Sequence, residues 1–204
     1  MAPFLKRAVA TTNTFATLEA VHCEWAQDSG DLSGSTAILG TYQDGILVMA
    51  GIGDSGGLFC DHTGDFQILC PRHTTDNPRE VERVLSMGGK IIGNRVGGVL
   101  MPTRSLGDLD VKQQCGEGVV SPVPEMAFAR VVAAPAPAPL PFLVLASDGL
   151  FDVMTYKAVA DLARKSLKAK FSKWPARDTA DELVRAALQL GSKDDVTVVV
   201  VVFE

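Results

Sequence analysis

Two aspartates follow a strongly apolar stretch at a spacing that could bind a metal ion. The segment LVLASDGLFDVM, residues 143–154, reads as a buried strand that stops at Asp148, and Asp152 follows four residues later. A carboxylate at the end of a buried strand is costly unless a partner neutralises its charge. A divalent cation is one such partner, because Mg²⁺ and Mn²⁺ prefer hard oxygen ligands. The segment therefore predicts further ligands elsewhere in the chain.

A second motif, GDSGG at residues 53–57, suggests a different chemistry. It matches the nucleophile segment of trypsin-like serine proteases, and AVHC at residues 20–23 resembles their histidine segment. His22 and Ser55 are only 33 positions apart, which is too little chain for that protease fold. We therefore expect that Ser55 is not a nucleophile, and that a strand ends on Asp54 with glycines where the chain turns.

Length and charge exclude several classes of protein. The chain has 204 residues, 47% of them apolar, which suits one domain with a sizeable core. The net charge is −5 and no basic patch stands out, so direct nucleic-acid binding is not expected. No apolar run approaches the length of a membrane span.

The cysteines and the N-terminus bear on the compartment. The four cysteines are dispersed without CxxC spacing, as in an intracellular chain with reduced thiols. Residues 1–18 contain no acidic side chain, which faintly resembles a mitochondrial transit segment. We expect an intracellular protein, cytoplasmic or mitochondrial, with residues 1–14 as a flexible or transit-like lead-in.

Helices and strands are mixed along the chain without regular βαβ alternation, which favours an α+β sandwich. The turn signal Asp44-Gly45 predicts a hairpin between two strands. Asp76 or Asn77 caps a predicted helix that ends at Gly88-Gly89, and AAPAPAPLPF is a surface connector. The other expected elements are helices over 15–26, 154–170 and 178–191 and strands over 143–149 and 195–204.

Seven segments in one order carry a family resemblance. They are SGSTA, GDS, DNPREVERVLSMGG, RVGGVLMPTRSLGD, VVSPVPEM, LVLASDGLFDVM and GSKDDVTVVVVVF. Together they resemble the PP2C family of metal-dependent Ser/Thr protein phosphatases. The resemblance implies that residues 1–204 form a single PP2C-like domain. Its fold would be an α-β-β-α sandwich of two antiparallel-rich sheets flanked by helices.

The same resemblance implies a metal site. Asp148 and Asp194 match family aspartates that bind the catalytic metals, while Asp54 and Asp152 match positions associated with a third, weaker metal. The metals would be Mg²⁺ or Mn²⁺. Two such ions about 3.5–4 Å apart can activate a bridging water and clamp phosphate oxygens.

Departures from the family argue against catalysis. The family's Asp-Gly-His-Gly-Gly segment and the phosphate-binding Arg before it have no match, so the domain reads as N-terminally truncated. Gly56 replaces an Arg, and Arg72 replaces the usual acid beside His73. Arg95 and Arg104 match family arginines that are structural. We therefore expect a residual metal cluster of doubtful occupancy and no catalytic residue.

Three interpretations of function remain open at this point. The favoured one is a catalytically inactive pseudophosphatase that acts as a binding or scaffold subunit in a protein complex. The alternative is an active Mg- or Mn-dependent phosphatase of phosphoserine and phosphothreonine, with its N-terminal segment supplied elsewhere. The third is a small metal-binding protein. Missing strands would leave sheet edges uncovered, so a protein partner or a homo-oligomer is expected.

Overall fold

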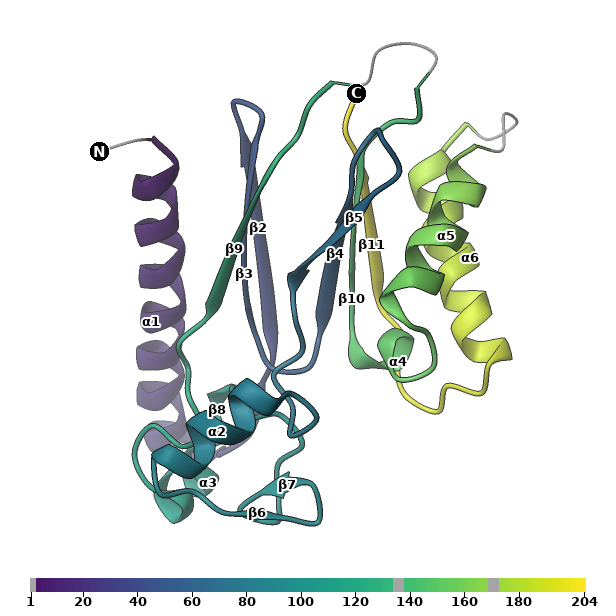
Figure 1. Ribbon diagram of the computed structural model, residues 1–204. Coiled ribbons are helices and arrows are strands. Elements are labelled where there is room, and N and C mark those ends of the chain that lie inside the picture. Colours follow the sequence, from purple (N-terminus) through teal and green to yellow (C-terminus); the bar gives the residue numbers. More distant parts are fainter. Residues whose placement is uncertain (1–2, 134–137, 169–172) are drawn as a thin grey trace. The chain divides into compact units, whose positions relative to one another are not determined.

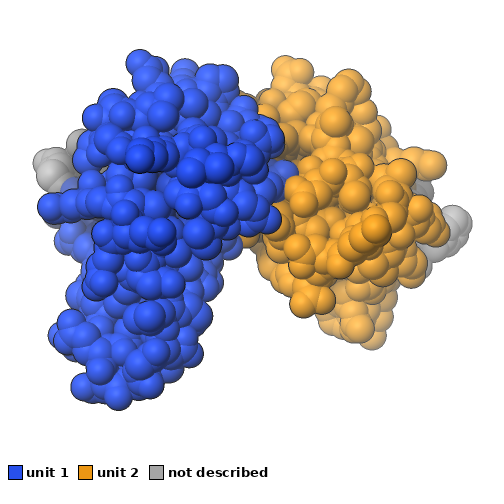
Figure 2. Space-filling view, turned by 90° about the horizontal axis from the view of Figure 1, so that it is seen from below, with its two compact units in different colours: residues 1–40, 48–54, 71–126 blue, residues 41–47, 55–70, 127–204 orange. Residues whose placement is uncertain are grey.

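The structure is a computed structural model that describes residues 3–133, 138–168 and 173–204 (Figure 1). The chain divides into two compact units, coloured separately in Figure 2. Unit 1 comprises residues 1–40, 48–54 and 71–126, and unit 2 comprises residues 41–47, 55–70 and 127–204. Each unit is therefore assembled from three separate stretches of chain.

The strands form antiparallel-rich sheets that helices flank, which confirms the expected α+β fold class. One sheet has four strands in the order β11-β10-β4-β5, and another has three in the order β2-β3-β9. Two short pairs, β1-β8 and β6-β7, complete the set in the described chain. The strand bounds are β1 Gly34–Ser35, β2 Ala37–Gln43, β3 Ile46–Ile52, β4 Gly56–Cys60, β5 Phe66–Cys70, β6 Ile91–Ile92, β7 Arg95–Val96, β8 Leu106–Gly107, β9 Glu125–Arg130, β10 Phe142–Ala146 and β11 Val198–Val202.

Unit 2 has its core between the four-stranded sheet and two helices, α5 (Tyr156–Leu167) and α6 (Pro175–Gln189). Alternate residues of β4 and β10, such as Leu58 and Val144, face the helices and are fully buried. Val159 of α5 and Leu183 of α6 are also fully buried in this cluster. The period-2 pattern of the strands and the apolar stripes of the helices thus meet in one core.

Strand β11 forms one edge of that sheet, and its outer side is open. Ser147 and Phe203 make backbone hydrogen bonds between the β10 and β11 segments, to Thr197 and Pro141 respectively. In an antiparallel ladder such bonds fall on every second residue. The even-numbered residues Val198, Val200 and Val202 therefore direct their N–H and C=O groups away from β10. No other strand of the described chain pairs with them.

Unit 1 is built around the long helix α1 (Pro3–Ser29), which lies against β8. Phe15 of α1 is 1% exposed and packs with Ala50, Ile52 and Leu106. Helices α2 (Pro78–Ser86) and α3 (Leu109–Cys115) complete the unit around a second apolar cluster that contains Val84, Val111 and Val119.

Two helices begin earlier than the sequence predicted. Helix α1 was expected from Phe15 but begins at Pro3, so the expected lead-in is helical. Helix α6 was expected to be capped by Asp178 but begins at Pro175, and Asp178 lies in its first turn. Proline suits that position because its fixed φ is helical and it lacks an N–H that would go unpaired.

Turn chemistry was more predictable, with one exception. Asp44 and Gly45 have positive φ angles of 52° and 72° and form the expected tight turn between β2 and β3. Asn77 caps α2 by accepting a hydrogen bond from the Arg79 N–H. The exception is the pair Gly56 and Gly57, expected at a turn, which lie inside the buried strand β4.

Two short helices were not predicted: α3, and α4 (Asp148–Phe151) directly after β10. The four cysteines are free thiols. Within the described chain, no helix combines the length and apolar character that a membrane crossing requires.

Candidate functional site: two acidic loops of unit 2

Two acidic loops leave the same end of the sheet in unit 2. Strands β10 and β11 are antiparallel, and Ala146 at the end of β10 pairs with Val198 at the start of β11. Asp148 begins α4 two residues after Ala146, and Asp194 lies in the loop before β11. The register of one strand pair therefore brings together segments that are more than forty residues apart in sequence.

Side-chain hydrogen bonds join the two loops. The Ser147 hydroxyl donates to the Asp195 carbonyl at 3.0 Å and accepts from the Thr197 N–H at 3.0 Å. The Ser192 hydroxyl donates to the Gly149 carbonyl at 2.7 Å. These hydrogen bonds tie together the loops that carry Asp148 and Asp194.

Gly149 is needed for this close approach. A Cβ at this position would lie 2.7 Å from the Asp195 carbonyl oxygen and 3.1 Å from a methyl carbon of Val196. Only glycine lets the backbones come together without displacement. The Asp-Gly pair thus combines an acid with the residue that lets the second loop lie against it.

Asp148, Asp152 and Asp194 lie on the two acidic loops, but in the described chain their carboxylates do not approach one another closely enough to form a compact three-ligand group. Asp148 is half-buried, whereas Asp152 and Asp194 are exposed. The Asp152 N–H donates to the Asp148 carbonyl at 2.8 Å, and the Asp194 Oδ1 accepts from the Asp195 N–H at 2.7 Å. Such donors fit Mg²⁺ or Mn²⁺. The predicted metal role of these residues stays a prediction.

Asp54 lies in unit 1, just after β3, and is 9% exposed. Its backbone carbonyl accepts a hydrogen bond from Arg72 Nε at 2.8 Å. The Arg at residue 72, which departs from the family pattern, therefore holds the segment that carries Asp54. That Asp54 shares a metal with the aspartates of unit 2 also stays a prediction.

The surroundings of Gly56 in unit 2 account for the glycine that stands there in place of the family's arginine. A Cβ on Gly56 would lie 2.6 Å from the Phe151 ring and 2.7 Å from the Tyr156 hydroxyl. The two rings are in contact in a tilted arrangement, with centroids 4.5 Å apart and an interplanar angle of 34°, and the Tyr156 hydroxyl donates to the Cys70 carbonyl. An aromatic pair therefore occupies the space that an arginine side chain would enter.

A second group with metal-ligand chemistry lies in unit 1. One ligand atom from each of His73, Glu80 and Glu125 lies within 4.8 Å of the others. His73 is 1% exposed, and its Nε2 is 3.3 Å from Glu125 Oε2. The sequence analysis had not singled out Glu80 or Glu125.

Glu80 is already neutralised by protein groups. Its carboxylate accepts from Arg104 on both oxygens, from Arg83 Nε at 3.0 Å and from the Thr103 hydroxyl at 2.7 Å. Burial by itself raises the pKa of Glu80, but the hydrogen bonds from Arg104, Thr103 and Arg83 outweigh it and lower the pKa to about 2. Two guanidinium groups would repel a cation here, so this group is a structural network.

His73 is neutral in this network. Burial lowers the pKa of His73, and the nearby positive charge of Arg104 lowers it further. Its Nδ1 is buried without a hydrogen-bond partner, so this imidazole is held by packing and by Glu125.

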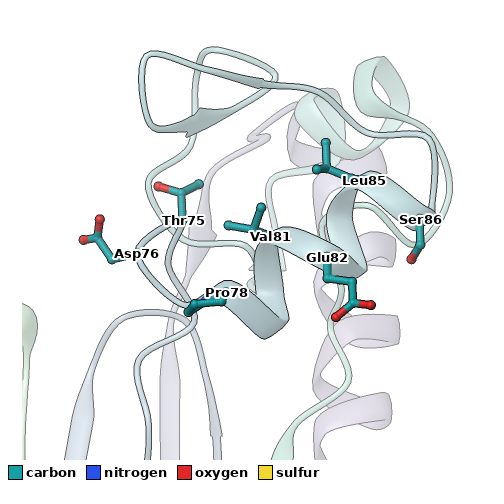
Figure 3. A pocket seen from close by; sticks show the side chains of 7 residues that line it. All are labelled: Thr75, Asp76, Pro78, Val81, Glu82, Leu85 and Ser86. Carbon is teal, nitrogen blue, oxygen red and sulfur yellow. The ribbon is translucent and has the colours of Figure 1, made fainter.

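A hollow of about 750 Å³ lies along one side of α2 in unit 1 (Figure 3). Its only ionisable lining groups are Asp76 and Glu82, and Figure 3 shows their side chains pointing away from each other. The lining comes from one short stretch of chain, residues 75–86. No acid–base pair or nucleophile is assembled there, so the acidic loops remain the candidate site.

Comparison with known proteins identifies the family. The family model described as Protein phosphatase 2C matches residues 4–196. The chain belongs to the protein phosphatase 2C family. It is 34% identical over 186 residues to probable protein phosphatase 2C 68 of Oryza sativa subsp. japonica, covering 90% of this chain and 49% of that protein. It is 32% identical over 183 residues to protein phosphatase 1A of Homo sapiens, covering 85% and 44%.

Solved structures support the same PP2C fold. A sex-determining protein of C. elegans matches with a TM-score of 0.76 and 25% identity, over 94% of this chain and 45% of that one. The serine-threonine phosphatase 2C of Toxoplasma gondii matches with a TM-score of 0.73 and 21% identity, over 96% and 66%. The chain spans about half the length of the curated PP2C relatives it matches.

Proposed function

We propose that the PP2C domain of residues 1–204 does not by itself hydrolyse phosphoserine or phosphothreonine, and that it acts as a binding subunit. The observation that carries this proposal is the composition of the candidate site. Asp148, Asp152 and Asp194 stand on two joined loops, but the 204 residues contain no Asp-Gly-His-Gly-Gly segment. The aromatic pair beside Gly56 also fills the space of an arginine.

The missing groups matter because phosphomonoester hydrolysis is among the slowest uncatalysed reactions. When bound, Mg²⁺ or Mn²⁺ supplies Lewis-acid activation of water and neutralises phosphate charge. Asp148, Asp152 and Asp194 offer carboxylates for such an ion, although they form no compact three-ligand group in the described chain. Without a bridging carboxylate, two divalent cations would repel each other with too few ligands between them.

The decisive assay incubates the purified chain with a phosphothreonine peptide and Mn²⁺ or Mg²⁺. We expect no phosphate release above that of the metal ion alone. A Mn²⁺-dependent rate that Asp148→Asn abolishes would refute the proposal. Asp181→Asn removes an exposed carboxylate from α6 and serves as the matched control, since Asp181 lies outside the acidic loops.

The second candidate function is an active phosphatase that needs a further segment. The hydrogen bonds from Ser147 and Ser192 favour it, because they join the two loops that carry the acidic side chains. Adding a synthetic peptide with the family's Asp-Gly-His-Gly-Gly segment should then produce Mn²⁺-dependent activity. Under the favoured proposal the peptide has no effect on the rate.

The binding role rests on the open edge of β11. Val198, Val200 and Val202 direct backbone donors and acceptors outward, and valine side chains flank them on both sides of the sheet. An exposed edge without charge, proline or bulge is a template for another strand. The occupant we propose is an extended, β-branched or apolar segment of a protein partner, added beside β11 as an extra strand.

Val200→Pro tests this edge. The substitution removes an outward N–H and leaves the inward bonds of Val199 and Val201 to β10 intact, a placement that edge strands tolerate. We expect Val200→Pro to abolish binding to valine-rich strand peptides, while Val200→Thr retains it. Sedimentation of the isolated chain at low concentration supplies the other check. If the chain self-associates and Val200→Pro dissociates it, the strand added beside β11 comes from a second copy of this chain and not from a different protein.

A further inference from the structure

A cavity of about 560 Å³ lies in unit 2 between the end of α5 and the beginning of α6. It also contacts the start of β10 at Phe142 and the end of β11 at Val202, which are paired residues. The acidic loops lie at the other end of these two strands, where Ala146 pairs with Val198. Figure 1 shows α4 at that far end of unit 2. The cavity is therefore separate from the candidate metal site.

Part of the lining of the cavity is apolar. Leu140, Phe142, Leu167 and Val202 contribute to its lining. Trp174 also lines the cavity and is 63% exposed, and Leu140 is 42% exposed. Large apolar side chains that remain exposed around a concave surface are typical of ligand-binding sites.

The lining also carries an excess of positive charge. Among the described residues, four cations line the cavity, against one acid, Glu204: they are Arg164, Lys168, Lys173 and Arg177. The excess is notable because the whole chain has a net charge of −5. Clustered like charges are unfavourable unless an opposite charge offsets them.

The cations differ in how they are already engaged. Arg164 pairs with Asp161 at 3.3 Å, and Lys173 lies 5.6 Å from the centroid of the Trp174 ring. Lys168 and Arg177 form no ion pair within the described part of the chain. Two guanidinium or ammonium groups beside the cavity are therefore available to an anion.

From this arrangement we infer that the cavity binds a small anionic amphiphile: a carboxylate or phosphate on an apolar chain or ring. The anionic group would contact Lys168 and Arg177, with Lys173 beside it, and the apolar body would cover Phe142, Leu140 and Trp174. A volume of about 560 Å³ falls within the range of small-molecule sites. The inference does not depend on whether the acidic loops catalyse a reaction.

Dodecyl phosphate, used below its micelle-forming concentration, is a suitable probe. The chain has two tryptophans, so the Trp25→Phe variant leaves Trp174 as the only indole reporter. We expect a saturable change in Trp174 emission. Dodecanol lacks the charge and inorganic phosphate lacks the apolar body, so each should bind at least about tenfold more weakly. Equal binding of either fragment would overturn the inference.

Charge variants provide the matched control. The double variant Lys168→Gln/Arg177→Gln should weaken dodecyl phosphate binding by about tenfold or more, because charge-assisted contacts are lost. Lys165→Gln/Arg185→Gln removes the same charge from the same two helices, outside the cavity, and should leave binding unchanged. Equal loss in both double variants would show a general charge effect and refute the site. Binding only to anionic vesicles, with none to the monomeric amphiphile, would also refute it.

Discussion

The guanidinium of Arg104 contacts both carboxylate oxygens of Glu80 in unit 1. Arg104 Nε lies 3.2 Å from Oε1 and 3.1 Å from Oε2, and Nη2 lies 2.5 Å from Oε1. Glu80 is 2% exposed, so water does not screen this pair. Arg83 adds a second guanidinium and ties the network to the carbonyl of Thr103. The network therefore links α2 to the loops around residues 103–119 in unit 1.

Glu80 should make the stability of the protein sensitive to acid. Its folded pKa of about 2 lies below the ordinary value of 4.5, so its contribution is present above pH 4.5 and is lost as the pH falls toward 2. The shift corresponds to about 3 kcal/mol of unfolding free energy. Urea unfolding of Glu80→Gln should show that loss already at pH 7. Glu82→Gln, exposed on the same helix, should unfold like the unsubstituted chain at each pH.

His73 should affect the unfolding free energy in a different pH range from Glu80. Its folded pKa is lowered from 6.5, so the unfolded chain binds the proton more tightly. The unfolding free energy should therefore fall as the pH drops below about 6.5. In His73→Gln this part of the pH dependence should disappear. Unfolding curves between pH 5 and pH 8 measure it, and an unchanged slope in the variant would contradict the assignment.

Gly149→Ala should destabilise the acidic loops. The added Cβ would meet the Asp195 carbonyl at 2.7 Å, and a backbone atom cannot move aside cheaply. We expect a loss of about 1–3 kcal/mol in unfolding free energy. Gly40→Ala is the control, because its Cβ would meet the flexible thioether of Met49 at 2.8 Å. Similar losses in both variants would argue against a special role for the Gly149 contact.

Ser55 should not react with a fluorophosphonate probe in the folded protein. The histidine of the protease-like pattern, His22, lies on α1 beside Gly107, and its Nδ1 is buried without a hydrogen-bond partner. No carboxylate therefore orients the imidazole as catalytic serine chemistry requires. Mass spectrometry of the labelled protein gives the answer, and a modified Ser55 would revive the protease interpretation.

Features set by neighbouring residues were predictable from the sequence. The Asp44-Gly45 turn and the Asn77 cap depend on a few adjacent side chains, and both were found. The start of α1 was missed because threonines at positions 11, 12 and 14 are poor helix formers. Burial of Thr11 and Phe15 against the rest of unit 1 outweighs that local preference.

The acidic loops could be predicted from the sequence and the Glu80 network could not, again because only the first depends on local sequence motifs. Asp148 and Asp194 could be singled out because they stand in motifs that match a family. Arg104 is 24 residues from Glu80, and Glu125 is 52 residues from His73, so no local sequence pattern predicts these contacts. Only the folded chain brings them together, and a family match does not report the pairing of buried charges.

The division of the chain into interleaved stretches has a consequence for biosynthesis. The last stretch of unit 1 ends at Met126, so a ribosome has made all of that unit before it finishes unit 2. Unit 2 cannot complete its sheet until β11 emerges from the ribosome. Before that, β10 lacks a neighbouring strand on one side: the edge that β11 later covers, residues 142–146, has no partner strand in unit 2.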